Sequence, residues 1–161
     1  MWDSFGVRSL YKYGKIWYTK YMNVFALWKN RIRRFFYERK RKALGLFFPL
    51  FCKVHGVKNA DFQGALAQTR AGDRLQYVHV PVEKYPHNVY VYSVTLNRVL
   101  GYLDKDLSKR LIKLFKKGFC RDAVAENRTG GGEYKYFGCN IRLLETADMM
   151  EGCDISALRE A

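Results

Sequence analysis

The sequence predicts an α+β protein in which a small, closed or nearly closed β-barrel follows a basic helical arm. Three observations predict this: basic residues gather in the first third of the chain, several short β-branched and aromatic segments follow, and one amphipathic helix lies among them. A chain of 161 residues, 48% of them hydrophobic, has room for one domain plus an extension. The expected organisation is an arm over residues 1–48, a barrel module over 49–144 and an acidic tail over 145–161.

The charge is concentrated at one end. Residues 1–58 carry fourteen Lys or Arg against two acids, Asp3 and Glu38, which gives a net charge of +12. Residues 59–161 carry fifteen basic and thirteen acidic residues, a net charge of +2, and the tail from Glu145 is acidic. A block this basic repels itself unless an anionic partner lies nearby. The sequence therefore indicates nucleic acid, an anionic membrane surface or an acidic protein as the partner.

The arm has the pattern of an amphipathic helix from Lys15 to about Leu44. Gly45 is suited to its C-terminal end, and Pro49 prevents continuation. Its apolar residues recur at steps of three or four and form one stripe: Trp17, Tyr21, Val24, Phe25, Trp28, Ile32, Phe35 and Phe36.

Three interpretations of this arm stay open at the level of sequence. The aromatic stripe packs on the following domain and the basic residues are solvated. Alternatively, Lys and Arg contact phosphates while the aromatic residues stack on bases. As a third possibility, the helix lies on anionic lipid, with Trp and Phe inserted and the cations on headgroups.

Other features bear on the compartment and on metal chemistry. Neither apolar segment, 21–28 or 43–52, reaches the roughly 20 residues of a membrane-crossing helix. We expect a cytoplasmic protein, with peripheral membrane association left open. Cys52, Cys120, Cys139 and Cys153 form no CxxC pair, so we expect reduced thiols. His55, His79 and His87 have no ligand spacing with them, so we expect no metal and no cofactor.

The module reads as a series of strands with two intervening segments. Ala60–Thr69 fits a short helix or a turn, and turn residues stand at 71–73 and 96–98. The expected strands are Leu50–Val57, Leu75–Val80, Val89–Thr95, Val99–Leu103, Phe119–Glu126 and Tyr134–Leu144. The loop around Gly130–Gly132 joins the last two, and we interpret its glycines as flexibility rather than as a phosphate loop.

The amphipathic helix of the module is expected between Asp104, its N-cap, and Lys117, with Gly118 at its end. One face carries Leu107, Leu111, Leu114 and Phe115, and another carries Lys105, Lys109, Lys113 and Lys116. We interpret the lysines as the solvated face.

Several short motifs follow one another in a particular order. Gly72-Asp73 precedes a strand, Pro81 ends that strand, and Tyr85 and Asn88 stand in the next loop. Val99–Leu103 has a hydrophobic-Gly-Tyr-hydrophobic pattern and leads into the amphipathic helix. On these features, the run from about Val54 to Leu144 resembles the HIRAN domain, an OB-like barrel with inserted helices.

The resemblance implies a site. HIRAN domains bind DNA, including single-stranded ends, through this loop and neighbouring aromatic residues. It therefore implies Tyr85 and Tyr102 as stacking residues, with a structural role as the alternative, and Asn88 and His79 as polar contacts. We expect phosphate contacts from three arginines of the arm: Arg31, Arg33 and Arg34.

The loop also departs from the family pattern. The family's Arg-Glu before the proline is His79-Val80 here, Val89-Tyr90 replaces its Ala-Ile pair, and two polar loop positions are Glu83 and Pro86. Glu83 would repel phosphate. This motivates a rival hypothesis, an adaptor docked through the arm on an anionic membrane surface or an acidic protein.

No arrangement of residues indicates catalysis. Ser93 and Ser108 lack a GxSxG context, and Asp104 and Asp106 suit a helix start better than a metal. We therefore expect a non-catalytic binding protein, with nucleic acid, DNA in particular, as the favoured partner.

Overall fold

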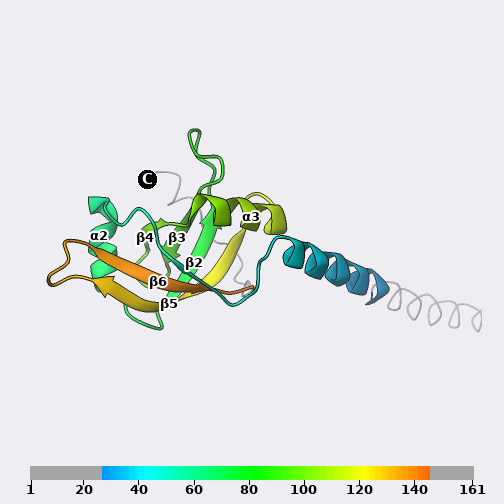
Figure 1. The fold of residues 1–161 in the computed structure, drawn as a ribbon, viewed down its shortest axis with the longest axis horizontal. Coiled ribbons are helices and arrows are strands. Elements are labelled where there is room, and N and C mark those ends of the chain that lie inside the picture. The colour runs from blue at the N-terminus through cyan, green and yellow to red at the C-terminus, as the bar shows by residue number, and fades with distance from the viewer. Residues whose placement is uncertain (1–26, 146–161) are drawn as a thin grey trace, which may run out of the picture. The chain divides into compact units, whose positions relative to one another are not determined.

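The computed structural model describes residues 27–145, which form an α+β fold (Figure 1). Contacts divide the chain into two units, Met1–Ala43 and Leu44–Ala161. In the first unit, residues 27–43 are helical, in agreement with the predicted arm. Four residues of the predicted stripe, Trp17, Tyr21, Val24 and Phe25, and the acidic tail beyond Glu145 lie outside the described residues.

The second unit begins a few residues before the predicted boundary at 48/49. Leu46 is fully buried, and the ring of Phe48 lies 5.8 Å from that of Phe115. Residues 44–48 therefore pack as part of the module. The segment shows neither helical nor strand periodicity, so only long-range contacts identify Leu46 as a core residue.

The module is built on one curled, six-stranded antiparallel sheet with the strand order β1-β6-β5-β2-β3-β4. The strands are β1 (Leu50–Lys53), β2 (Arg74–His79), β3 (Val89–Ser93), β4 (Arg98–Tyr102), β5 (Cys120–Gly130) and β6 (Phe137–Leu143). All six correspond to predicted strands. The differences lie at the ends: β1 stops at Lys53, β5 continues to Gly130, and β6 begins only at Phe137.

The two edge strands of this sheet meet at one point. Beyond β1, the Val54 amide donates to the Cys139 carbonyl, and His55 then pairs with Tyr102 of β4 through amide-to-carbonyl bonds of 2.8 and 3.1 Å. A Cβ at Gly101 would collide with the His55 carbonyl oxygen, so glycine permits this approach. The sheet is thus curled like a barrel, and a single bridge joins its edges.

Alternating residues of the strands form the core. Fully buried side chains point to one side of the sheet from five strands: Leu75 and Tyr77, Val89 and Val91, Leu100, Ala123, Ile141 and Leu143. Their partners in the register, such as Ala123 opposite Leu143, keep the apolar faces together.

Two helices complete the module, whereas the sequence predicts one and is compatible with either a short helix or a turn at Ala60–Thr69. Helix α2 (Ala60–Gln68) has Asn59 as its N-cap and packs against β4 and β6. Helix α3 (Lys105–Phe115) is capped by Asp104 and buries Leu107, Leu111 and Leu114, as predicted. It ends at Phe115, whose ring lies 6.5 Å from that of Tyr77.

The β5–β6 hairpin depends on its glycines. Gly130, Gly131 and Gly132 all have positive φ, and a Cβ at Gly131 would collide with the Phe137 ring. The side chain of Gln63 in α2 accepts from the Phe137 amide at 2.9 Å and donates to its carbonyl at 3.0 Å. The triplet is therefore a conformational requirement of an anchored hairpin, not only the flexible connection expected from sequence.

Candidate functional site

The loop between β2 and β3, residues 80–88, projects from the sheet (Figure 1) and is held by backbone hydrogen bonds between its own residues. Val82 and Tyr85 form an isolated bridge, and the Asn88 amide donates to the Tyr85 carbonyl at 3.1 Å. The backbone of Tyr85 is thus held while its side chain is 68% exposed. We call this segment the 80–88 loop.

His79, predicted as a polar contact to a ligand, lies behind this loop and is 2% exposed. Its Nδ1 accepts from the Gly118 amide at 2.8 Å, so Nε2 must carry the proton and donate to the Pro86 carbonyl at 3.0 Å. Its ring also stacks on Phe119, with centroids 6.0 Å apart. Nε2 therefore holds the 80–88 loop and Nδ1 holds the turn after α3, and neither nitrogen is presented to a ligand.

A cleft of about 940 Å³ opens beside the 80–88 loop. It is lined by the loop, by the start of α2, by β3 and β4 and by the first turns of α3. The aromatic lining residues are Phe62, Tyr85, Tyr90 and Tyr102, and the basic ones are Lys58, Lys84, Lys105 and Lys109, with His87 beside them. We call this the lysine–tyrosine cleft.

No carboxylate lines the cleft. Glu83, which was expected to repel phosphate, belongs to the loop but not to the cleft lining. Asp106 contacts the cleft lysine Lys109 at 3.7 Å, yet its own side chain is 84% exposed. The four lining lysines outnumber the exposed acids at the first turn of α3, Asp104 and Asp106, which gives the cleft a positive potential.

The helix N-termini near the cleft are already capped. The Asn59 side chain accepts from the Asp61 amide, and Asp104 accepts from the amides of Asp106 and Leu107 at 2.9 and 3.3 Å. The Leu107 bond is the main reason that the pKa of Asp104 lies below its usual value. The positive character of the cleft therefore comes from the lysines rather than from open helix ends.

The cleft brings together three of the predicted site residues. Tyr85, Asn88 and Tyr102 all line it, and the half-buried Asn88 side chain has no hydrogen bond within the described part of the chain. Tyr102 is 41% exposed, and its ring covers Gly56. Tyr102 therefore has both a packing contact and a face on the cleft.

The remaining predicted residues are Arg31, Arg33 and Arg34, which are exposed on the 27–43 helix in the other unit. Arg34 pairs with Glu38 at 3.2 Å. This helix carries eight Lys or Arg against one acid, and Leu27, Trp28, Phe35 and Phe36 are each 59–66% exposed on it. The arm therefore combines cations and exposed aromatic residues in its described part.

The cleft lysines are not recognisable from the sequence. Lys58 and Lys84 belong to segments that carry no pattern, and the spacing of Lys105 and Lys109 predicts a solvated helix face. Lys58, Lys84 and Lys105 are separated by 26 and 21 residues along the chain, and only the folded sheet brings them to one cleft. The net charge of the 80–88 loop gave no signal, because it carries one lysine, Lys84, and one acid, Glu83.

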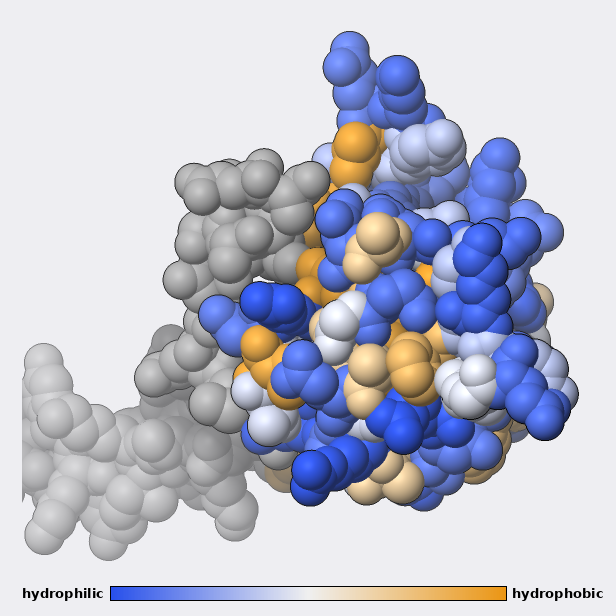
Figure 2. All heavy atoms as spheres, turned by 90° about the vertical axis from the view of Figure 1, so that its left-hand side faces the viewer, coloured by the Kyte–Doolittle hydropathy of each residue, from blue (hydrophilic) through white to orange (hydrophobic). Residues whose placement is uncertain are grey.

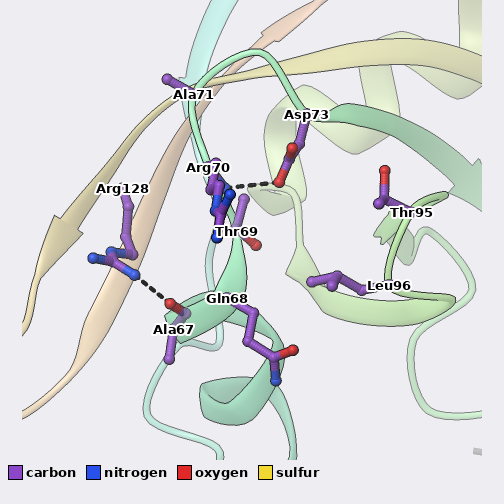
Figure 3. A pocket seen from close by; sticks show the side chains of 9 residues that line it. All are labelled: Ala67, Gln68, Thr69, Arg70, Ala71, Asp73, Thr95, Leu96 and Arg128. Carbon is purple, nitrogen blue, oxygen red and sulfur yellow. Dashed lines mark hydrogen bonds between the residues drawn. The ribbon is translucent and has the colours of Figure 1, made fainter.

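A second hollow, of about 840 Å³, lies at the C-terminal end of α2 (Figure 3). Arg128 donates there to the Ala67 carbonyl, and the Arg70 amide donates to Asp73 at 2.7 Å. The Arg128 guanidinium and the Asp73 carboxylate are thus occupied by the chain itself. Figure 2 shows this α2 side of the module as a mostly hydrophilic face with small separated apolar spots.

Two cysteines of the described residues, Cys52 and Cys139, are partly or fully buried thiols rather than reactive thiolates. Burial raises the pKa of Cys52 to about 12 and that of Cys139 to about 11. Both thiols are therefore protonated at neutral pH and poor nucleophiles. Cys52, Cys120 and Cys139 form no disulfide, and residues 27–145 contain no cluster of three His, Cys, Asp or Glu side chains arranged for a metal.

The fold and the cleft define a class: an α+β module with a curled antiparallel sheet and a basic, aromatic cleft at its rim. No protein-family model, curated protein or solved structure matches the chain. Within residues 27–145, no helix combines the length and apolarity needed to cross a bilayer.

Proposed function

We propose that this protein is a non-catalytic nucleic-acid-binding protein of the HIRAN-like, OB-like type, with single-stranded or end-containing DNA as the favoured ligand. The lysine–tyrosine cleft carries the proposal, because it combines four lysines, four aromatic rings and no carboxylate in its lining. Single strands are bound by this combination: cations follow the phosphates, and bases stack on aromatic faces.

Within the cleft, each residue type has a distinct task. Tyr85, on a loop whose backbone is fixed, offers a ring for stacking on a base. Asn88 offers an amide that can donate to and accept from a base edge. Lys58 and Lys84 neutralise phosphates from two sides of the cleft.

The arm adds charge that carries no sequence information. Arg31, Arg33 and Arg34 are exposed and offer further phosphate contacts. In this scheme the cleft selects unpaired bases, and the arm raises affinity and association rate for any polyanion.

The test is a titration of labelled single-stranded and duplex DNA at roughly 50 and 200 mM salt. We expect preference for the single strand and a steep loss of affinity at the higher salt, because bound cations are released. Tyr85→Ala should weaken single-strand binding about 10-fold, consistent with the roughly 1–3 kcal/mol of one stacking contact.

Tyr134→Ala is the matched control. Tyr134 is 74% exposed but lies on the β5–β6 hairpin, outside the cleft. Its replacement should leave affinity unchanged. Equal losses in the two variants, or no binding by the folded protein at low salt, would refute the proposed function.

A second candidate is an adaptor docked on an anionic membrane surface or acidic protein through the arm. One observation favours it: Trp28, Phe35 and Phe36 are about 60% exposed on a helix with eight basic residues. Such side chains suit the lipid interface. Cosedimentation with neutral and anionic vesicles tests it, and Trp28→Ala with Phe35→Ala should abolish binding that depends on anionic lipid.

A further inference from the structure

A row of lysines runs along α3. Lys105, Lys109 and Lys113 follow one another at intervals of four residues, so each is turned by about 40° from the last and lies on the same side of the helix. Lys116 and Lys117 stand just beyond the helix end at Phe115. The opposite side is buried through Leu107, Leu111 and Leu114. We call the five lysines, at positions 105, 109, 113, 116 and 117, the α3 lysine row.

The row begins inside the lysine–tyrosine cleft and leaves it. Lys105 and Lys109 line the cleft, together with Ser108 from the same turns. Lys113, Lys116 and Lys117 do not line it and are exposed. Helix geometry places Lys113 about 12 Å along the axis from Lys105. The row is therefore a continuation of the cleft's positive surface along the helix.

Most of the row has no neutralising partner. Among residues 27–145, one lysine of the row forms an ion pair: Lys109 lies 3.7 Å from the Asp106 carboxylate. Two arginines of the sheet, by contrast, are paired: Arg74 with Asp122 at 3.4 Å and Arg142 with Glu126 at 2.7 Å. At the far end of the row, the Arg121 guanidinium lies 4.8 Å from the centroid of the Phe115 ring and adds another cation.

We propose that a single strand held in the cleft continues along α3, where Lys113, Lys116 and Lys117 bind its next phosphates. This inference rests on the proposed function. Successive lysines of the helix are about 6 Å apart along the axis, which lets each one neutralise a separate phosphate of an extended strand. The cleft then reads the bases, and the row sets how many nucleotides the site covers.

The experiment compares two oligothymidylates, one of about 4 nucleotides that fills only the cleft and one of about 15 that reaches beyond it. The full chain carries Lys113→Gln, Lys116→Gln and Lys117→Gln together. We expect unchanged affinity for the short strand and a loss of at least 10-fold for the long one at about 50 mM salt. The slope of log affinity against log salt should fall by about 2, because three single-strand phosphate contacts contribute roughly 0.7 each.

The matched control removes the same charge elsewhere, with Lys53→Gln, Arg70→Gln and Lys135→Gln, three exposed residues outside the cleft and the row. It should bind both strands like the unmodified protein. Equal losses in the two triple variants would refute the proposed role of the α3 lysine row, and so would equal affinity and salt slope of the unmodified protein for the short and long strands. If the unmodified protein binds neither strand, the proposed function is refuted together with the role of the row. Thermal unfolding confirms that each variant is folded.

Discussion

At the scale of single residues, His79 is part of the scaffold behind the 80–88 loop. His79→Ala removes the acceptor of the Gly118 amide and the donor to the Pro86 carbonyl. We expect unfolding free energy to fall by about 1–3 kcal/mol, since buried partners lose their bonds. Urea unfolding measures this. Tyr85→Ala, at an exposed side chain on the same loop, should change stability by less than about 0.5 kcal/mol; equal effects would contradict the role of His79.

Asp104 gives a pH dependence whose sign follows from its cap. Amide hydrogen bonds, that of Leu107 first, hold its pKa below the usual 3.8. Its stabilising contribution is therefore fully present above the unfolded value and is lost as the pH falls through the lower folded value.

Asp104→Ala should lower the unfolding free energy by about 1 kcal/mol at pH 7, as expected for loss of an N-cap. The difference between the two proteins should shrink as the pH falls below about 4. Asp104→Asn keeps the acceptor and should remove only the charge-dependent part. A difference that is constant from pH 7 to pH 2 would show that the ionised cap does not contribute.

At the scale of elements, α3 depends on its buried leucine face. Leu111 is fully buried, so Leu111→Ala should lower the unfolding free energy by about 2–5 kcal/mol. Leu111→Asp should cost several kcal/mol or prevent folding, because it buries an unpaired charge. Lys113→Ala, on the exposed side of the same helix, is the control and should change stability little. Chemical denaturation monitored by circular dichroism compares the three, and a tolerated Leu111→Asp would refute the packing of α3.

At the scale of the whole module, one bridge joins the edges of the curled sheet. Gly101→Ala adds a Cβ that collides with the His55 carbonyl at a φ of +150°. We expect a loss of at least about 1–3 kcal/mol from backbone strain alone, and faster hydrogen exchange at the His55 and Tyr102 amides.

Gly72→Ala is the control for this closure. Gly72 also has a positive φ, of +88°, but a Cβ there would meet no atom within 4 Å. It should suffer the conformational strain without loosening the bridge. If both variants leave exchange at His55 and Tyr102 unchanged, the bridge does not hold the edges together.

Local pattern was enough to predict most elements. Alternation of β-branched and aromatic residues located all six strands, and Asp104, the leucine spacing and Gly118 located α3. These features are encoded by neighbours a few residues apart, so they can be read along the chain. The ends of β1, β5 and β6 were less predictable because they depend on which strand lies alongside.

By itself, the sequence determined the basic arm, the α+β class and the grouping of Tyr85 with Asn88 in one loop. Only the tertiary structure decided that His79 is buried, that Leu46 belongs to the core, and that Lys58, Lys84, Lys105 and Lys109 share one cleft. The physical reason is the sequence separation of the residues that interact. Burial and the positive potential of the cleft arise from segments far apart in the chain, which the curled sheet brings together, and no local periodicity records that approach.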